Sequence, residues 1–304
     1  MIGLIVTDYN SMQETMGYIE RVTESNYFCK DQLAIVIVNN SLENTAKNYL
    51  NKVEYFYKSE KILDYKTYTF YVNKYKVRIV DSNSNNGYAG GNNIGSRICD
   101  YLYGDELDII IFSNNDVYFS DRFNLDNVIN IFNNNRDIGI VGTRVLSENG
   151  EDQNPRKDMT FITQMILWDI NIMLLRGILN KFIWNLDIKA KSSKKTGWVS
   201  GSFMFVRNDV FKKVGGFDTK TFLYCEEMIL SQKFRIEGYD TYYDFQDAVI
   251  HKHKGSNPTK KQREWNHESK KYYYSKYKGI SKVKLKFSDL IFKIVEFLYD
   301  IKHK

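Results

Sequence analysis

The chain has 304 residues, of which 43% are apolar, so it can fold as one large or two modest domains around a hydrophobic core. Its 43 basic and 37 acidic residues are intermixed and give a net charge of +6. This mild, scattered charge argues against a nucleic-acid-binding protein, in which basic residues cluster on one face. It is compatible with anionic ligands or with a membrane surface.

The cysteines and the N-terminus predict a cellular compartment. Cys29, Cys99 and Cys225 have spacings that match neither a zinc site nor a disulfide framework, so we expect free thiols in a reducing environment. The N-terminus enters a strand-like run at once and shows no signal peptide. No segment reaches about 18 uncharged apolar residues, so no membrane-spanning helix is predicted. We therefore expect a cytoplasmic protein.

Strands and helices alternate through the first half of the chain. Strands are predicted at Ile2–Val6, Ala34–Val38, Val77–Val80, Asp108–Phe112 and Ile138–Val141, from short β-branched runs. Helices are predicted after a capping-box pattern at Ser11 and Glu14, over Ala46–Val53, after Asn85 and over Leu125–Phe132. This alternation predicts an α/β fold with a mostly parallel, Rossmann-like central sheet flanked by helices. The stretch Glu54–Lys76 is ambiguous, and Thr67–Val72 within it is either an extra strand or half of a hairpin.

The second half of the chain does not show this regular alternation of strands and helices. A polar loop (Ser147–Asp158) is followed by an apolar helical stretch (Phe161–Trp184) that carries too many charges to span a membrane. The other predicted elements are a strand at Trp198–Val206, a tight turn at Gly215–Asp218, a helix at Glu226–Glu237 ended by Gly238, and short strands at Tyr242–Tyr243 and Ala248–Ile250. The chain then becomes basic and aromatic. It ends in an amphipathic helix with Phe287, Leu290, Ile291, Ile294, Phe297, Leu298 and Ile301 on one side.

Two segments carry candidate chemistry. The strand Asp108–Phe112 is followed by Asn114, Asn115 and Asp116, and ligands of open α/β sheets bind outside the carboxyl ends of the strands. These residues are also typical of a simple turn. The glycine-rich segment Asn85–Gly95 leads into a helix, where backbone amides can approach an anion. A tight strand-to-helix connection explains that segment equally well.

Five stretches occur in an order that indicates a family: LIVTDYN (4–10), VIVNNS (36–41), NNGYAGGNNIG (85–95), SNNDV (113–117) and WVSGSFMFVRNDVFKKVGGFDTKTFLYCEE (198–227). With them the chain resembles the family-2 glycosyltransferases of the GT-A fold, most closely the rhamnosyltransferase-like branch that builds bacterial surface polysaccharides. The resemblance covers residues 1 to about 256. It implies a GT-A domain over 1–256, with a nucleotide-sugar-binding half (1–145) and an acceptor-binding half (146–256). A basic amphipathic helical extension (257–304) follows.

The resemblance implies a divalent cation, Mn²⁺ or Mg²⁺, that neutralises the diphosphate of a nucleotide sugar. The Asp-x-Asp motif of the family falls on Asn114, Asn115 and Asp116, so Asp116 is the expected direct ligand and the two amides are expected on the phosphate side. His251 stands where many members carry a histidine near the metal. His253 is the alternative, because a small misalignment would exchange the two.

The resemblance also implies a catalytic base. The acidic pair of the family falls on Glu226 and Glu227, with Glu227 as the base and Glu226 as a donor-side or orienting group. Two carboxylates at a helix start also stabilise the helix dipole without any catalytic role. The usual Asp is replaced here by the longer Glu, and an acid common two positions later is replaced by Ile229.

The nucleoside is expected against the first two strand ends, at Thr7, Tyr9 and Asn39. The family usually has Asp at the last of these positions, and Asn39 can still pair with an imide. Gly91, Asn92 and Asn93 are expected along the ribose and phosphates.

Together these features predict an inverting, metal-dependent glycosyltransferase that moves rhamnose or a similar hexose. The expected donor is a dTDP- or UDP-linked sugar, and the expected acceptor is a glycan of the cell envelope or capsule, or a lipid-linked saccharide. A nucleotidyltransferase that makes an activated sugar and a non-catalytic GT-A scaffold are the alternatives. The C-terminal helix is expected either to dock peripherally on the inner face of the cytoplasmic membrane or to pack on its own domain or on a second subunit of a homodimer.

Overall fold

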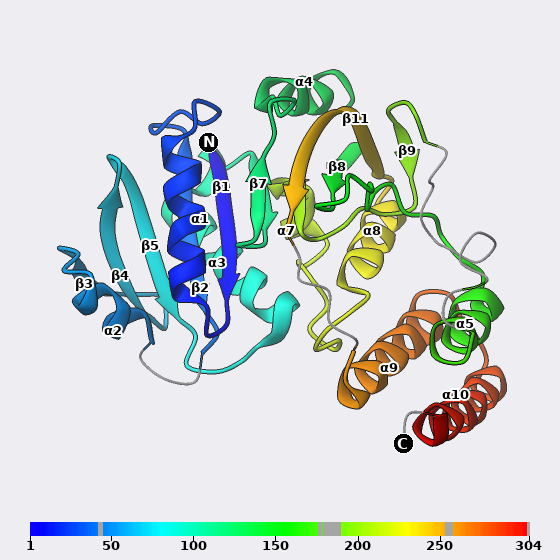
Figure 1. Ribbon diagram of the computed structural model, residues 1–304. Helices are drawn as coiled ribbons and strands as arrows, with labels where there is room; N and C mark the ends of the chain where they lie inside the picture. The colour runs from blue at the N-terminus through cyan, green and yellow to red at the C-terminus, as the bar shows by residue number, and fades with distance from the viewer. Residues whose placement is uncertain (42–44, 176–177, 179–189, 253–257, 303–304) are drawn as a thin grey trace.

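The computed structural model describes residues 1–41, 45–175, 178, 190–252 and 258–302. Its centre is one mixed sheet in the order β3-β4-β5-β2-β1-β6-β10-β8-β11-β7, with β9 paired to β11 (Figure 1). The strands are β1 (Ile2–Asp8), β2 (Leu33–Asn39), β3 (Lys58–Ile62), β4 (Tyr65–Val72), β5 (Tyr75–Asp81), β6 (Ile109–Ser113), β7 (Val117–Phe119), β8 (Ile138–Leu146), β9 (Lys194–Thr196), β10 (Phe203–Arg207) and β11 (Asp240–His251).

The described helices are α1 (Met12–Glu24), α2 (Thr45–Lys52), α3 (Gly87–Tyr103), α4 (Leu125–Asn134), α5 (Trp168–Met173), α7 (Asn208–Lys213), α8 (Glu226–Ile236), α9 (Lys260–Lys276) and α10 (Lys282–Lys302), with a short 3₁₀ turn η1 (Gly104–Glu106) and a π-helical turn η2 (Thr163–Leu167). Judged by hydropathy and length, the described helices include none that could cross a bilayer.

The α/β class expected from the sequence is confirmed, and the sheet is mixed. Strands β5, β2, β1 and β6 run parallel, as do β8 and β11, which agrees with the expected parallel order. The remaining pairings are antiparallel, because β3 and β4 form a meander with β5, and β7, β9 and β10 return in the opposite direction. The ambiguous stretch Glu54–Lys76 therefore contributes an extra hairpin to one edge of the sheet.

The parallel strands bring their polar ends to one edge of the sheet. In the register, Asp8 stands opposite Asn39, and Asn39 stands opposite Asp81. On the other side of β1, Val6 pairs with Ser113 at the end of β6. The Asn114–Asp116 segment therefore leaves the sheet beside the end of β1, as strand ends in parallel sheets require.

Both faces of the sheet are covered by helices. On one face Met16 of α1, Leu50 of α2 and Val128 of α4 join one apolar core with residues of the strands, and α1 contacts β1 whereas α4 contacts β8. On the other face α3, α7 and α8 pack Ile98, Phe234 and their neighbours against the intervening residues. Strands buried on both faces need continuous apolar runs, which is why these strands were visible in the sequence.

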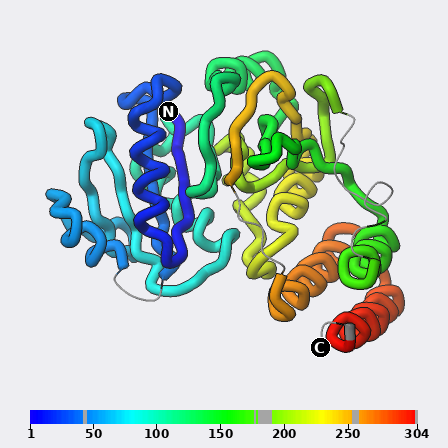
Figure 2. The backbone as a smooth tube through the Cα atoms, viewed as in Figure 1, coloured from blue at the N-terminus to red at the C-terminus, as the bar shows by residue number. Residues whose placement is uncertain are grey.

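A third group of helices lies beside the sheet. The segments η2, α5, α9 and α10 gather at one corner, and the tube in Figure 2 shows the orange and red C-terminal helices far from the blue hairpin edge. Met165 and Ile229 pack there against Tyr273 and Leu285, which joins α8 to the C-terminal helices.

Several local predictions were wrong. Ser11 precedes α1 but makes no capping bond to the helix: its hydroxyl donates to Asp8 and accepts from the side-chain amide of Asn115. The two short strands at Tyr242–Tyr243 and Ala248–Ile250 are one strand, β11, interrupted by an irregularity between Asp244 and Ala248. The predicted strand at Trp198–Val206 begins only at Phe203, and Trp198 forms an isolated bridge with Arg156. The predicted helix Phe161–Trp184 is η2 followed by α5, and much of its second half lies outside the described residues.

Candidate active site

The three residues after β6 point to three different places. The backbone N–H of Asn114 donates to the carbonyl of Ser202, 2.8 Å away, and the Asn114 side chain lines a cavity. The amide of Asn115 donates to the hydroxyls of Ser11 (2.9 Å) and Thr15 (2.8 Å), so it ties β6 to α1. Asp116 turns instead toward the end of β11. Asn114 is therefore placed for ligand contact, whereas Asn115 has an internal hydrogen-bonding role.

Asp116 and His251 lie side by side. Antiparallel pairing of β7 with β11 sets His251 opposite Val117, and the Nε2 atom of His251 is 3.1 Å from Oδ1 of Asp116. The Nδ1 atom of the ring lies 3.1 Å from Oε1 of Gln153, a contact that orients the imidazole. A carboxylate oxygen and an imidazole nitrogen suit Mn²⁺ and, through oxygen alone, Mg²⁺.

This pair fits a site in which the protein supplies part of the coordination of a cation. Within the described part of the chain, no three His, Cys, Asp or Glu side chains are grouped to hold a metal. A nucleotide site of this kind usually leaves the other positions to phosphate oxygens and water. His253 lies outside the described residues.

The acidic pair begins α8 after two strained residues. Tyr224 and Cys225 both have left-handed backbones, with φ of +75° and +69°. Non-glycine residues rarely adopt this conformation, and it clusters at functional sites. It fixes Glu226 and Glu227 at the helix start. Glu227 accepts a hydrogen bond of 2.9 Å from the backbone N–H of Gly201. The carbonyl of Gly201 accepts a hydrogen bond of 2.7 Å from the Tyr88 hydroxyl.

The surroundings raise the pKa values of this cluster. Burial, followed by the neighbouring carboxylate of Glu227, raises the pKa of Glu226, which is 3% exposed. Burial raises the pKa of Glu227, while the Gly201 N–H and the Arg156 guanidinium oppose that rise. Burial also raises the pKa of Tyr88, with further increases from both carboxylates. Perturbed acids grouped in a cavity are typical of active sites.

One cavity of about 340 Å³ joins these elements. Its wall contains Asn114, His251, Glu226 and Glu227, which come from the end of β6, the end of β11 and the start of α8. A second part of the wall is aromatic, with Trp168, Trp198 and Tyr224, and α9 contributes Asn266 and Lys270. The wall thus combines carboxylates with aromatic rings, which suits a polyhydroxy ligand with an apolar ring face.

The residues expected at the nucleoside lie along the neighbouring strand ends, outside this cavity. Thr7 donates to Oδ1 of Asn92 at 3.3 Å, and a Cβ on Gly91 would collide with the side chain of Thr7. Tyr9, the first residue after β1, is 51% exposed.

Two expected ligand contacts are already occupied by protein partners. The amide of Asn39 donates to Asp81 at 2.8 Å, and its oxygen accepts from Ser41 and Thr45. Asn93 binds the backbone of Phe217 through both its oxygen and its nitrogen, each at 2.9 Å. Both side chains hold neighbouring segments in place in this structure.

The sequence did not identify Arg156, Tyr88 or Lys270 as site residues. Arg156 stacks over the Trp198 ring at 5.5 Å, and burial lowers its pKa to about 10. In the sequence, Arg156 was recognisable only as one of two adjacent basic residues in a polar loop. Tyr88 lay within the glycine-rich segment, whereas Lys270 gave no signal because its lysine-rich surroundings suggested a solvated face.

Comparisons with known proteins give the family. The pattern described as "Glycosyl transferase family 2" matches residues 5–215. The chain is 24% identical over 166 residues to the O-antigen chain rhamnosyltransferase WbaN of Salmonella anatum. The aligned residues make up 53% of this chain and 46% of that protein. It is 38% identical over 60 residues to an N-acetylglucosaminyl-diphospho-decaprenol L-rhamnosyltransferase of Mycobacterium tuberculosis, and these residues make up 20% of each chain. The matches thus span less than half the length of these curated relatives.

Two solved structures share the fold. The mannosyltransferase PcManGT of Pyrobaculum calidifontis, in complex with GDP-Man and Mn²⁺, aligns with a TM-score of 0.53 at 15% identity over 87% of this chain and 59% of that one. GalNAc-T7, solved with UDP, GalNAc and Mn²⁺, aligns with a TM-score of 0.52 at 11% identity over 97% of this chain and 55% of that one. Both are glycosyltransferases, and the shared architecture is the GT-A fold expected from the sequence. Together with the pattern match over most of its length, this means that the chain belongs to glycosyl transferase family 2.

Proposed function

We propose that the protein is an inverting, metal-dependent glycosyltransferase. It would transfer rhamnose or a similar hexose from a nucleoside-diphosphate sugar to a bacterial cell-surface glycan or to a lipid-linked acceptor. The observation that carries this proposal is the cavity whose wall contains Asn114, His251, Glu226 and Glu227. The names of the curated relatives, both rhamnosyltransferases, support the choice of sugar.

In this proposal Asp116 and His251 hold Mn²⁺ or Mg²⁺, which when bound offsets the negative charge of the leaving diphosphate. Thr7, Tyr9 and the Asn39 region border the nucleoside, and Gly91 to Asn93 border the ribose and phosphates. Residues 1–145 and 146–256 act as the donor-side and acceptor-side halves of one domain. The extension 257–304 completes the acceptor side, because Asn266 and Lys270 of α9 reach the cavity.

Glu227 is the proposed base. Its Oε1 atom accepts the Gly201 N–H at 2.9 Å, which holds the carboxylate in one orientation. It takes the proton of the acceptor hydroxyl while that oxygen forms a bond to the anomeric carbon, and the bond from that carbon to the phosphate oxygen breaks. Attack from the face opposite the leaving group inverts the configuration. The aromatic wall formed by Trp168, Trp198 and Tyr224 would hold the acceptor sugar by its apolar ring face.

We propose the cytoplasm as the compartment. Cys99 and Cys225 are buried free thiols and Cys29 is an exposed one, which supports a reducing cytoplasm as the site of action. A nucleotide sugar is available there, and an acceptor on the inner face of the cytoplasmic membrane would be within reach.

Ligand-dependent melting tests the donor site. UDP, dTDP and GDP are each added with and without Mn²⁺, and a nucleotide at a hundred times its dissociation constant should stabilise the fold by about 2.7 kcal/mol. Asp116→Ala should abolish the Mn²⁺-dependent part of the shift, whereas the exposed Asp121→Ala should retain it. No shift with any of the three nucleotides would argue strongly against the proposal.

A panel of nucleotide sugars with Mn²⁺ tests the reaction. Release of the nucleoside diphosphate should fall by about 10²- to 10⁴-fold in Glu227→Gln. Pyrophosphate release from a nucleoside triphosphate would instead indicate a nucleotidyltransferase. Unchanged turnover in both Asp116→Ala and Glu227→Gln would contradict the assigned site.

A further inference from the structure

The C-terminal helix α10 has two apolar faces, and only one of them is packed. Leu285, Phe292 and Val295 are buried against η2, α5 and α9. The opposite face carries a stripe of residues three and four apart, each between 43% and 78% exposed: Val283, Phe287, Leu290, Ile294, Phe297, Leu298 and Ile301. At 1.5 Å per residue this exposed stripe is about 27 Å long. Contiguous apolar surface of this length is uncommon in a soluble monomer.

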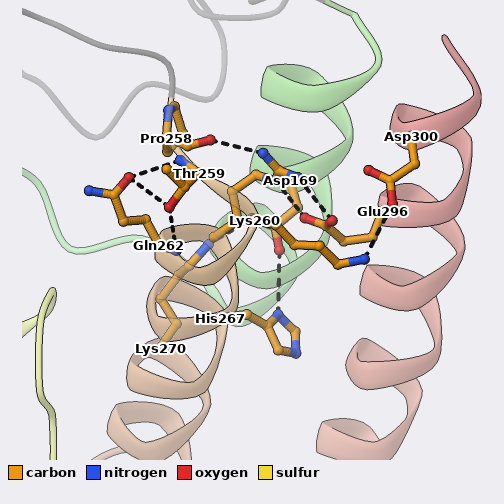
Figure 3. A network of polar contacts seen from close by, with 10 residues as sticks. Asp169, Pro258, Thr259, Lys260, Gln262, His267, Lys270, Glu296 and Asp300 are labelled. Carbon is orange, nitrogen blue, oxygen red and sulfur yellow. Dashed lines mark hydrogen bonds and ion pairs between the residues drawn. The ribbon is translucent and has the colours of Figure 1, made fainter. Parts of the chain in front are cut away.

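The acidic residues of α10 all face its neighbour α9. Glu296 accepts from Arg263 at 2.5 and 3.1 Å, and Asp300 pairs with Lys260 at 3.2 Å (Figure 3). Asp289 pairs with His267 at 3.0 Å and with Lys271 at 2.9 Å. The negative charge of the helix is therefore neutralised on the side that faces the protein.

Three exposed lysines of α10 border the exposed stripe. Lys282, Lys284, Lys286 and Lys293 are exposed, and among the described residues none of them has a carboxylate within ion-pair distance. At 100° per residue, Lys284 borders one side of the stripe, and Lys286 and Lys293 border the other. The outward surface of α10 is thus apolar in the middle and positively charged at its edges.

This charge pattern indicates which of two partners, a second copy of the chain or a lipid surface, would cover the exposed stripe. The three-four spacing would also suit a helix of a second copy. In a pair of such helices, however, α10 has no unpaired acid to offer the lysines of the second copy, because Asp289, Glu296 and Asp300 are all bonded to α9. An anionic lipid surface instead satisfies both features, because the apolar stripe enters the acyl boundary and lysines extend to the headgroups.

We propose that the protein docks on anionic lipid bilayers through this outward face of α10. The helix α9 lies between α10 and the cavity, since Asn266 and Lys270 face the cavity while Arg263 and His267 face α10. Docking would therefore place α10 and α9 between the bilayer and the cavity. The inference does not depend on sugar transfer, since it concerns a separate surface and its test needs no donor.

Sedimentation with vesicles tests the proposal on the full chain. We expect binding to vesicles of phosphatidylcholine mixed with phosphatidylglycerol, weaker binding to phosphatidylcholine alone, and loss of the difference at high salt. Phe287→Ser combined with Leu290→Ser, and separately Lys284→Gln with Lys286→Gln and Lys293→Gln, should each weaken binding to anionic vesicles by about tenfold or more.

The control variants replace exposed residues elsewhere on the protein. Phe56→Ser, at a side chain 97% exposed, and the triple change Lys47→Gln, Lys74→Gln, Lys76→Gln should bind as the wild type does. Thermal melting of every variant checks the fold. Equal binding by wild type and α10 variants would overturn the proposal. So would a dimer in light scattering that dissociates in the Phe287→Ser, Leu290→Ser variant without any vesicle binding, because the stripe would then be occupied by a second copy.

Discussion

At the scale of single residues, the two neighbouring glutamates differ in what supports their charge. Glu227 accepts a backbone N–H from Gly201 and lies near the Arg156 guanidinium. Glu226 is buried, and its Oε1 atom has no hydrogen-bond partner among the described residues. Two carboxylates this close share their titration, and the proton is held by the one with the poorer support. Glu226 is therefore the member that we expect to stay neutral, which agrees with the proposed role of Glu227 as the base.

Glu226→Gln should stabilise the fold in a pH-dependent way. The raised pKa of Glu226 means that its protonated form contributes stability that is fully present below the unfolded pKa of about 4.5 and is lost as pH rises through the folded value. Gln stays neutral throughout, so the melting temperature of the variant should exceed that of the wild type increasingly above about pH 4.5. Each unit of pKa difference corresponds to about 1.4 kcal/mol, or several degrees in the melting temperature.

The control for this prediction is Glu24→Gln, which changes an exposed carboxylate at the end of α1. Its melting temperature should follow that of the wild type at every pH. A Glu226→Gln variant that is less stable than the wild type at high pH would mean that the buried carboxylate is ionised and satisfied.

Gly201→Ala should impair catalysis without unfolding the protein. A Cβ at this position would collide with Oε1 of Glu227 and would lie 2.7 Å from the Tyr88 hydroxyl. Displacing the base by about 1 Å costs on the order of 100-fold in rate, so kcat should fall by about that factor while donor KM changes less. Steady-state kinetics with the active nucleotide sugar would measure both constants.

Gly17→Ala is the matched control, because its new Cβ would only contact Arg21, 3.7 Å away, on α1. It should leave kcat unchanged and stabilise the helix by about 1 kcal/mol. Equal kcat in the two alanine variants would show that the position of Glu227 does not limit turnover.

Some residues were predictable from the chain and others were not, for physical reasons. Asp116 was predictable, because a polar residue directly after a buried strand must emerge at the sheet edge. Its contact with His251 required the pairing of β7 with β11, and a three-residue strand is too short to leave a periodic signal. Asn39 is hydrogen-bonded to Asp81, and Asn93 is hydrogen-bonded to Phe217. Because these partners are far away in sequence, the residues around Asn39 and Asn93 did not indicate that the two amides are bonded within the protein.

At the scale of elements, the proposed acceptor side is built by segments whose sequences show only weak periodic patterns. The π-helical turn η2 projects Gln164 and α9 projects Lys270, and both line the cavity. The Lys270 ammonium donates to Asp169 at 2.8 Å and to the carbonyl of Gln164 at 3.2 Å, which joins the two segments. A buried cation in a lysine-rich sequence cannot be recognised from periodicity, since the partner that makes its burial tolerable lies about a hundred residues away.

Lys270→Met should destabilise the fold strongly. It removes the cation and leaves the Asp169 carboxylate buried beside His267, and losing one member of a buried ion pair costs about 3–5 kcal/mol. Lys271→Met is the neighbouring control, because that ammonium is partly exposed and its bridge to Asp289 is worth about 1 kcal/mol or less. Urea titrations of both variants would compare them. Similar midpoints would mean that the Asp169 carboxylate is satisfied without Lys270.

At the scale of the whole molecule, the two proposed halves share one sheet. β10, from the acceptor-side half, is inserted between β6 and β8 of the donor-side half. The sequence predicted strands alternating with helices in the first half and a less regular second half. It could not show the insertion, because strand order is set by long-range pairing and not by local pattern. The interleaving implies that the halves fold as one cooperative unit.

Ile37→Ala tests this cooperativity from the donor side. Ile37 is fully buried in β2, so its truncation should cost about 2–5 kcal/mol. All four tryptophans lie after residue 145, so tryptophan fluorescence reports the acceptor side and the extension, whereas far-ultraviolet circular dichroism reports the whole chain. Because β10 cannot keep its pairing once β6 is lost, both signals should shift to lower urea by the same amount. The exposed Val53→Ala should shift neither, and a fluorescence midpoint that stays at the wild-type value in Ile37→Ala would show that the halves unfold independently.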